Sequence, residues 1–353
     1  MKYQSFSLLI LLLSLIFSAC SPDSGSKDSV YLPKNPPLFK LLNSEQTGIT
    51  FSNPLEENLN LNVLMYEYLY NGGGVAIGDL NQDGLDDIYF SSNIGENQLY
   101  LNLGNLQFKE ISKISGAGGR PGPWKTGVVF ADVNGDGLLD IYLCRSGALM
   151  PEKRKNELFI NLGNDSNGIP QFKEMAEEYG IDSQYTSTSA AFFDFDRDGY
   201  LDLFLLNHNI RSVQNQDPAL TQKLLLEKHE SGSQLFENLG GKFVEITQKA
   251  GISSSSLSYG LGVNVSDINN DGWPDIYIGN DYTMPDYLYI NQKNGTFKDQ
   301  IQEMLDHVSH FSMGNDIADI NNDGLLDIFT LDMLPEDNYR QKLLLSPDNF
   351  EMY

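Results

Sequence analysis

The sequence predicts an all-β fold, a β-propeller of four-stranded blades, from three observations. A nine-residue acidic motif occurs five times, short runs rich in Val, Ile, Phe and Tyr flank each copy, and the copies recur at similar intervals. The flanking runs are typical of strands. Four strands in a period of about fifty residues are typical of a propeller blade.

The repeated motif is a candidate cation-binding loop. In Asp132–Asp140, acidic or amide side chains occupy the first, third, fifth and ninth positions, and Gly137 occupies the sixth. Ca²⁺ prefers six to eight oxygen ligands, and glycine permits the tight bend that such a loop needs. The five copies are Asp79–Asp87, Asp132–Asp140, Asp194–Asp202, Asp267–Asp275 and Asp319–Asp327.

Two other interpretations of the motif are considered. An EF-hand loop opens in the same way, but it needs a Glu at position twelve and flanking helices, and the residues at that position here carry no carboxylate. Asx turns between strands would need no metal. However, three or four clustered carboxylates without a counterion repel one another, at a cost of roughly several kcal/mol. This repulsion favours the interpretation with a bound divalent ion.

Each acidic loop joins two predicted strands, and two further strands follow it. Gly74–Gly78 and Asp87–Phe90 flank the first loop, and Gly127–Ala131 and Asp140–Leu143 flank the second. The predicted third strands are Gln98–Asn102, Glu157–Asn161, Gln234–Asn238 and Tyr287–Asn291. The predicted fourth strands start at Phe108, Phe172 and Phe243, and Phe39 with Thr47-Gly48-Ile49 repeats the same unit before the first loop.

Insertions account for the uneven spacing of the repeats. The third repeat carries Asn207–Ser233 between its second and third strands, with the segment Gln222–Leu226, and the fifth carries Asn338–Tyr353, with the similar segment Gln341–Leu345. We therefore expect about five blades, the last one incomplete, in an open ring that belongs to a longer chain. In the alternative, five blades close by themselves and the N-terminal strand at Phe39 completes the last one.

The N-terminus resembles a bacterial lipoprotein signal. In residues 1–19, Lys2 precedes an apolar run that is short for a membrane span, and small residues precede Cys20. An ordinary cleaved signal with an incidental Cys20 is the alternative. Residues 20–37 are polar and are predicted to be a flexible tether. We expect an exported lipoprotein, lipidated at Cys20, at the outer membrane or cell surface.

Composition limits the classes of partner. The chain has 353 residues, a formal charge of −25 and a pI near 4.3, so it lacks the basic face that nucleic acids require. Two cysteines imply no disulfide framework, and Cys144 is predicted to be a small buried hydrophobe.

The five loops between strands, with Asn71-Gly-Gly-Gly-Val-Ala-Ile-Gly-Asp79 ahead of the first, resemble the FG-GAP/VCBS repeats of integrin-α-type propellers. More closely, they resemble large bacterial lipoproteins with such repeats that often carry an ASPIC/UnbV domain further on, a domain that is not visible in this sequence. This resemblance covers Leu38 to Asp332. It implies a propeller with up to five structural Ca²⁺ ions and a role in binding or adhesion.

The resemblance also implies a set of calcium ligands in each loop, with the seventh residue offering its backbone carbonyl. These residues are Asp79, Asn81, Asp83, Leu85 and Asp87; Asp132, Asn134, Asp136, Leu138 and Asp140; Asp194, Asp196, Asp198, Tyr200 and Asp202; Asp267, Asn269, Asp271, Trp273 and Asp275; and Asp319, Asn321, Asp323, Leu325 and Asp327.

The main functional hypothesis is a binding module for an extracellular glycan or protein. The alternatives are a secreted glycan-active enzyme and a passive scaffold for a further C-terminal domain. No catalytic motif is found, so we expect no enzyme activity. His307 and His310 are too few for a zinc site. Trp124 follows a loop rich in Gly and Pro, where it could stack on a sugar or, as we favour, pack between blades.

Overall fold

The computed structural model describes residues 38–210, 223–282, 284–309, 311–333, 337 and 339. The chain divides into two compact units, Met1–Asn43 and Ser44–Tyr353. In the first unit, residues 38–43 are described and contain no helix or strand. The predicted lipoprotein signal with Cys20, the tether up to Pro37 and the segment Gln341–Leu345 lie outside the described residues.

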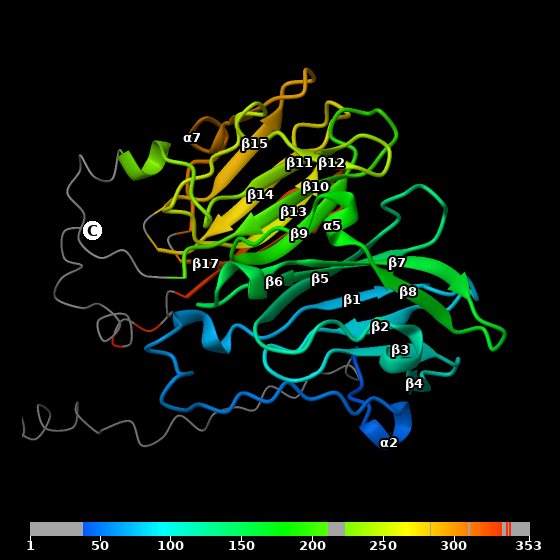
Figure 1. Ribbon diagram of the computed structural model, residues 1–353. Coiled ribbons are helices and arrows are strands. Elements are labelled where there is room, and N and C mark those ends of the chain that lie inside the picture. The colour runs from blue at the N-terminus through cyan, green and yellow to red at the C-terminus, as the bar shows by residue number, and fades with distance from the viewer. Residues whose placement is uncertain are drawn as a thin grey trace, which may run out of the picture. The chain divides into compact units, whose positions relative to one another are not determined.

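The second unit is built from antiparallel sheets that follow one another along the chain, four of them four-stranded, with two described strands in the fifth (Figure 1). The sheets are here called blades 1 to 5. Blade 1 contains β1 (Val75–Gly78), β2 (Asp87–Phe90), β3 (Gln98–Asn102) and β4 (Phe108–Glu110), and blade 2 contains β5 (Lys125–Ala131), β6 (Asp140–Arg145), β7 (Glu157–Asn164) and β8 (Pro170–Glu174). Blade 3 contains β9 (Ser187–Phe193), β10 (Asp202–Asn207), β11 (Gln234–Asn238) and β12 (Phe243–Glu245), blade 4 contains β13 (Gly260–Ser266), β14 (Asp275–Asn280), β15 (Tyr287–Asn291) and β16 (Phe297–Asp299), and blade 5 contains β17 (Ser312–Ala318) and β18 (Asp327–Asp332).

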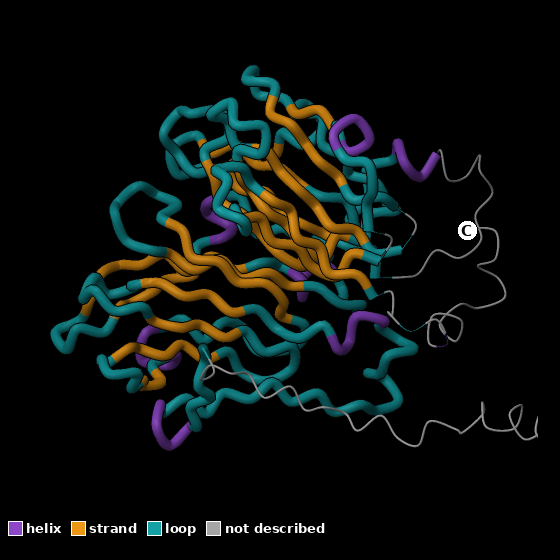
Figure 2. Tube along the Cα trace, turned by 180° about the vertical axis from the view of Figure 1, so that it is seen from behind, coloured by secondary structure: helices purple, strands orange, loops and turns teal. Residues whose placement is uncertain are grey.

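This architecture confirms the predicted blade. In each complete sheet, the chain runs through strand, acidic loop, strand, strand, turn and strand, and neighbouring strands pair in chain order. In blade 1 the register sets Gly78 opposite Asp87 and Tyr89 opposite Leu99. The first strands β1, β5, β9, β13 and β17 pack against one another in succession. Figure 2 shows the sheets from behind, with loops at both ends of the strands.

Apolar cores fill the spaces between adjacent blades, because alternate residues of a strand face opposite sides of its sheet. In β6, Ile141 and Leu143 face blade 1, where they join Tyr89 and Leu99. Tyr142 and Cys144 face blade 3, where they join Leu203 and Leu205. The next core, between blades 3 and 4, contains Phe204, Leu235, Ile276 and Ile278. Cys144 is fully buried, which confirms its predicted role as a core residue.

Short helices lie ahead of the first blade, between blades and, for the helix Pro151–Arg154, between the second and third strands of blade 2. They are α2 (Ser44–Thr47), η1 (Glu67–Tyr70), α3 (Ser112–Ser115), α4 (Pro151–Arg154), α5 (Ala176–Tyr179) and α7 (Ile301–Met304). In the part of the chain described by the structure, no helix is long and apolar enough to cross a membrane.

A glycine after the fourth strand of one blade rests on the fourth strand of the next. Gly116, Gly180 and Gly251 have φ near +80°, and a Cβ there would lie 2.8, 3.1 and 2.7 Å from the carbonyl oxygens of Phe172, Phe243 and Phe297 respectively. A residue with a side chain at these positions would therefore have both an unfavourable backbone conformation and a close contact between its Cβ and the neighbouring carbonyl oxygen.

Gly48 occupies the same place before blade 1, with φ of +78° and the oxygen of Phe108 only 2.5 Å from an added Cβ. This part of the predicted early repeat unit is present. The predicted strand at Phe39 is wrong: Leu38, Phe39 and Leu41 are exposed and form no strand. A strand needs a hydrogen-bonding neighbour, and an outer-strand pattern in the sequence does not supply one.

In blades 2 to 4, one asparagine of the third strand ties the blade to the preceding blade. Asn238 Nδ2 donates to the carbonyl of Val133, in the acidic loop of the preceding blade, at 3.1 Å, and to that of Leu201 in its own loop at 3.0 Å. Asn161 and Asn291 make the same pair of bonds in blades 2 and 4. The repeated Asn of the third-strand pattern therefore has a structural role.

Replacing Asn238 with alanine is expected to lower the free energy of unfolding by about 1–3 kcal/mol, because two buried carbonyls lose their donor. Chemical denaturation at fixed calcium concentration measures this change. Asn60→Ala, at an exposed position, is the control and is expected to have little effect. Equal stability of the two variants would contradict the role given to Asn238.

Candidate metal loops

The five acidic loops all connect the first strand of a blade to its second strand, as the sequence predicts. Their backbones share one conformation, with left-handed φ at the fourth and sixth residues; in the first loop these are Gln82 at +61° and Gly84 at +86°. The sixth residue is glycine in every copy, which relieves the steric cost of that conformation.

Side chains at the first, third and fifth positions organise the loop by accepting backbone hydrogen bonds. In the first loop, Asp79 accepts from the amides of Asp83 at 3.1 Å and Gly84 at 2.8 Å, Asn81 accepts from that of Asp83 at 3.2 Å, and Asp83 accepts from that of Leu85 at 2.9 Å. The other four loops repeat this set of bonds. Asx-type turns are therefore present. Each carboxylate oxygen has a second lone pair that remains available to a cation.

The aspartate at the ninth position is buried in blades 1 to 4 and binds two backbone amides. In the third loop, Asp202 accepts from Phe195 at 3.1 Å and from Asn238 at 2.8 Å. Burial raises the pKa of Asp87 to about 6 and those of Asp140 and Asp202 to about 7, although the amide hydrogen bonds oppose the shift. Neighbouring loop carboxylates also raise the pKa of these groups. A positive charge in the loop would relieve both effects.

The third loop brings carboxylates closest together. Ligand oxygens of Asp194, Asp196 and Asp202 lie within 4.8 Å of one another, an arrangement that fits one ion. This loop has aspartate at its third position, whereas the other four loops have asparagine there. An oxygen-only donor set of carboxylates, amides and carbonyls suits a hard cation such as Ca²⁺.

Adjacent loops also touch one another. Gln82 of the first loop donates to the carbonyl of Gly137 in the second at 2.8 Å. The Arg197 guanidinium of the third loop lies 4.7 Å from the centre of the Trp273 ring in the fourth. In the fourth loop, Lys293 pairs with Asp271 at 3.2 Å, so a lysine partly balances that carboxylate. The Trp273 side chain therefore packs against the neighbouring loop.

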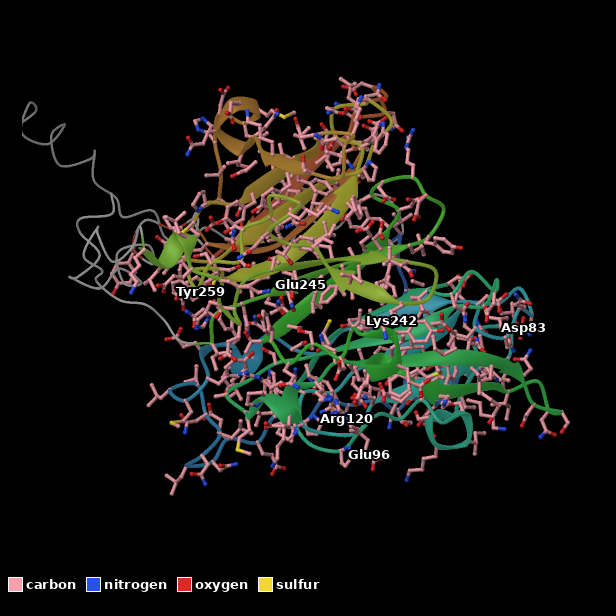
Figure 3. The ribbon with its side chains drawn as sticks, turned by 45° about the horizontal axis from the view of Figure 1, so that its top comes forward. Asp83, Glu96, Arg120, Lys242, Glu245 and Tyr259 are labelled. Atoms are coloured by element: carbon pink, nitrogen blue, oxygen red, sulfur yellow. The ribbon has the colours of Figure 1, made fainter. Side chains whose placement is uncertain are left out.

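The predicted metal ligands lie at one edge of the sheets, whereas Trp124 lies just before β5, at the other edge. Its side chain is buried and meets Tyr66 edge-on, with ring centres 5.3 Å apart. The packing interpretation of Trp124 is therefore confirmed. Figure 3 shows Asp83 of the first loop and Tyr259, a residue of the Trp124 cluster, at opposite ends of the molecule's sheets.

An open pocket of about 430 Å³ lies beside the first loop and was not predicted. Polar side chains of Asn81, Asp83, Asn102, Asn164 and Asn167 line it together with three leucines. Its walls come from blades 1 and 2, so no local sequence pattern could have identified it.

Comparison with known proteins agrees with this geometry. Residues 79–143 and 267–330, each starting at the first aspartate of a loop, match the family profile of the FG-GAP-like repeat. The chain carries FG-GAP-like repeats. The matched segments contain the first, second, fourth and fifth acidic loops.

Relatives with curated descriptions match parts of this chain. Cartilage acidic protein 1 of Xenopus tropicalis is 25% identical over 63% of this chain and 31% of its own length. Integrin alpha-3 of Mus musculus is 35% identical over 20% of this chain and 8% of its own length. The chain thus spans about a third or less of these relatives. A solved lectin structure from Agrocybe aegerita, described as recognising non-reducing terminal N-acetylglucosamine, covers 72% of this chain and 59% of its own at 17% identity, with a TM-score of 0.40.

Two substitutions in the third loop should separate structural bonds from metal binding. In chelator, Asp202→Ala is expected to lower the unfolding midpoint, because it leaves the amides of Phe195 and Asn238 unpaired, at about 1–3 kcal/mol each. Asp196→Ala should change the chelator midpoint little, since the amide of Asp198 keeps Asp194 as an acceptor.

Calorimetric titration with Ca²⁺ completes this test. Each variant is expected to bind one ion fewer per chain than the unmodified protein. If Asp196→Ala retains every calcium site, the assignment of this side chain as a ligand is wrong.

Proposed function

We propose that this chain is an exported, calcium-binding propeller that acts as a binding or adhesion module for a glycan or a protein. The acidic loops of its FG-GAP-like repeats carry this proposal. Five loops of one backbone conformation gather oxygen donors at one edge of the sheets, and the third loop brings three carboxylates within 4.8 Å.

In each loop, the side chains at positions one, three, five and nine and the carbonyl at position seven would hold the ion. When bound, Ca²⁺ would neutralise the negative charge of the loop carboxylates. The ninth aspartate keeps its two amide bonds and positions the loop against the third strand, as Asp140 does through Val133 and Asn161. The loops therefore serve to stiffen one edge of the blades, and we assign them no catalytic role.

The proposal places the protein outside the cytoplasm, anchored by a lipid on Cys20 at the outer membrane or cell surface. The support is the N-terminal sequence and the similarity to integrin alpha-3. Extracellular calcium at millimolar concentration is sufficient to fill weak oxygen-ligand sites.

The pocket beside the first loop supports a glycan as one ligand class. Four asparagine side chains and Asp83 offer donors and acceptors to sugar hydroxyls, and Leu85, Leu101 and Leu103 offer an apolar wall. A saturable interaction with a polysaccharide is expected to disappear in chelator. If purified protein releases products from a polysaccharide panel, the alternative of a glycan-active enzyme replaces the binding proposal.

Calcium is expected to raise the thermal unfolding midpoint of the full chain. A site at 100 times its Kd adds about 2.7 kcal/mol, and several such sites should give a rise of at least about 5 °C. Differential scanning calorimetry in excess Ca²⁺ and then in chelator measures it, with Mg²⁺ as the control ion. Coincident curves would contradict the calcium proposal and leave Asx turns as the explanation of the loops.

A further inference from the structure

Residues Asn53–Asn71, here called the strap, precede the first blade and lie across the strand ends opposite the metal loops. The Tyr66 hydroxyl lies 3.2 Å from His208 Nε2, just after β10, and the Tyr68 hydroxyl donates to Asp281 Oδ2, just after β14, at 3.2 Å. The Tyr66 ring also packs edge-on against Trp124, just before β5. Loops of three different blades therefore hold the strap.

The start of the strap is fixed to blade 1. Asn53 Nδ2 donates to Asn93 Oδ1 at 2.7 Å, and Asn93 in turn donates to the carbonyl of Lys125 at 2.8 Å. Tyr66, Tyr68 and Leu69 are buried. These contacts hold the strap in place, so that some of its side chains face the blades and others face solvent.

Several of the outward side chains of this fixed segment are apolar. Leu59 is 94% exposed, Leu64 92%, Tyr70 61% and Met65 60%. Single exposed apolar side chains are common, but several on one anchored segment are typical of an interaction surface. Each would gain about 1.5–3 kcal/mol if fully buried by a partner.

The charged side chains of the strap are all carboxylates. Residues 41–108 contain no Lys, Arg or His. Glu56, Glu57 and Glu67 are exposed on the strap itself, and Tyr70 donates to Glu57 at 2.8 Å, which holds a carboxylate beside the apolar side chains. Anionic lipid and nucleic acid are repelled by such a surface.

We propose that the strap is a docking surface for a cationic, amphipathic segment of a partner protein. Leu64, Met65 and Tyr70 contact the apolar face of that segment, and the strap glutamates attract its Lys and Arg side chains, which speeds association and sets the orientation. This inference rests on the proposed function as a binding module and specifies the face and the partner chemistry.

The test measures binding of a fluorescent 18-residue peptide of Leu and Lys at helical spacing to the full chain, by anisotropy in calcium buffer. A peptide with Glu in place of Lys is the charge control. We expect saturable binding of the Lys peptide alone. Leu64→Ser with Met65→Ser should weaken it at least about tenfold, and Glu56→Gln with Glu57→Gln should weaken it and reduce its salt dependence.

Leu162→Ser with Leu239→Ser is the matched control, because these leucines are 62% and 60% exposed but lie near the metal-loop ends of β7 and β11. This pair should leave binding unchanged. Unfolding midpoints of all variants establish that they are folded.

Equal affinity for both peptides, or no loss in the Leu64 and Met65 variant, would overturn the proposal. So would sedimentation of the protein with phosphatidylcholine vesicles that needs Leu64 and Met65 while the peptide fails to bind, because the surface would then face lipid. An intact calcium response without peptide binding refutes the docking surface alone. A missing calcium response with peptide binding refutes the calcium proposal alone.

Discussion

The buried carboxylate at the ninth position of each complete blade's loop is the interaction on which the blade geometry depends. Asp140 shows its connections: one oxygen accepts from Val133 in the same loop, and the other accepts from Asn161 in the third strand. The amide of Asn161 then reaches the carbonyl of Leu80 in the preceding blade. A single acidic side chain therefore links a loop, its own third strand and, through one asparagine, the neighbouring blade.

The burial of this carboxylate also determines the electrostatic cost of the loop. Burial raises the pKa of Asp140 to about 7, so the ionised form is costly in the folded protein without a compensating charge. Two amide hydrogen bonds offset only part of that cost. The nearby carboxylates of Asp136 and Asp132 raise the pKa further, so either a proton or a bound cation would lower the electrostatic cost of this loop.

The fold and the loops could be predicted because their determinants are local. The acidic spacing sets the loop, Gly137 allows its bend, and the alternation Ile141-Tyr142-Leu143-Cys144 gives the two faces of a strand between two cores. The strap could not be predicted, because Tyr68 meets a partner 213 residues away and nothing in the local pattern identifies Asp281. The strand expected at Phe39 failed for the related reason that strand formation depends on a partner as well as on a pattern.

The connections at the two ends of the strands differ in how much their lengths vary. At the acidic-loop end, every connection between first and second strands has the same length, and each of these loops repeats the same backbone hydrogen bonds to its first, third and fifth side chains. At the strap end, the connections between second and third strands differ greatly, from residues 281–286 in blade 4 to residues 208–233 in blade 3. Uneven repeat spacing therefore arises mainly at one end. At the strap end, loops of several blades meet around Tyr66 and Tyr68, so this edge combines connections of different length with a buried aromatic contact.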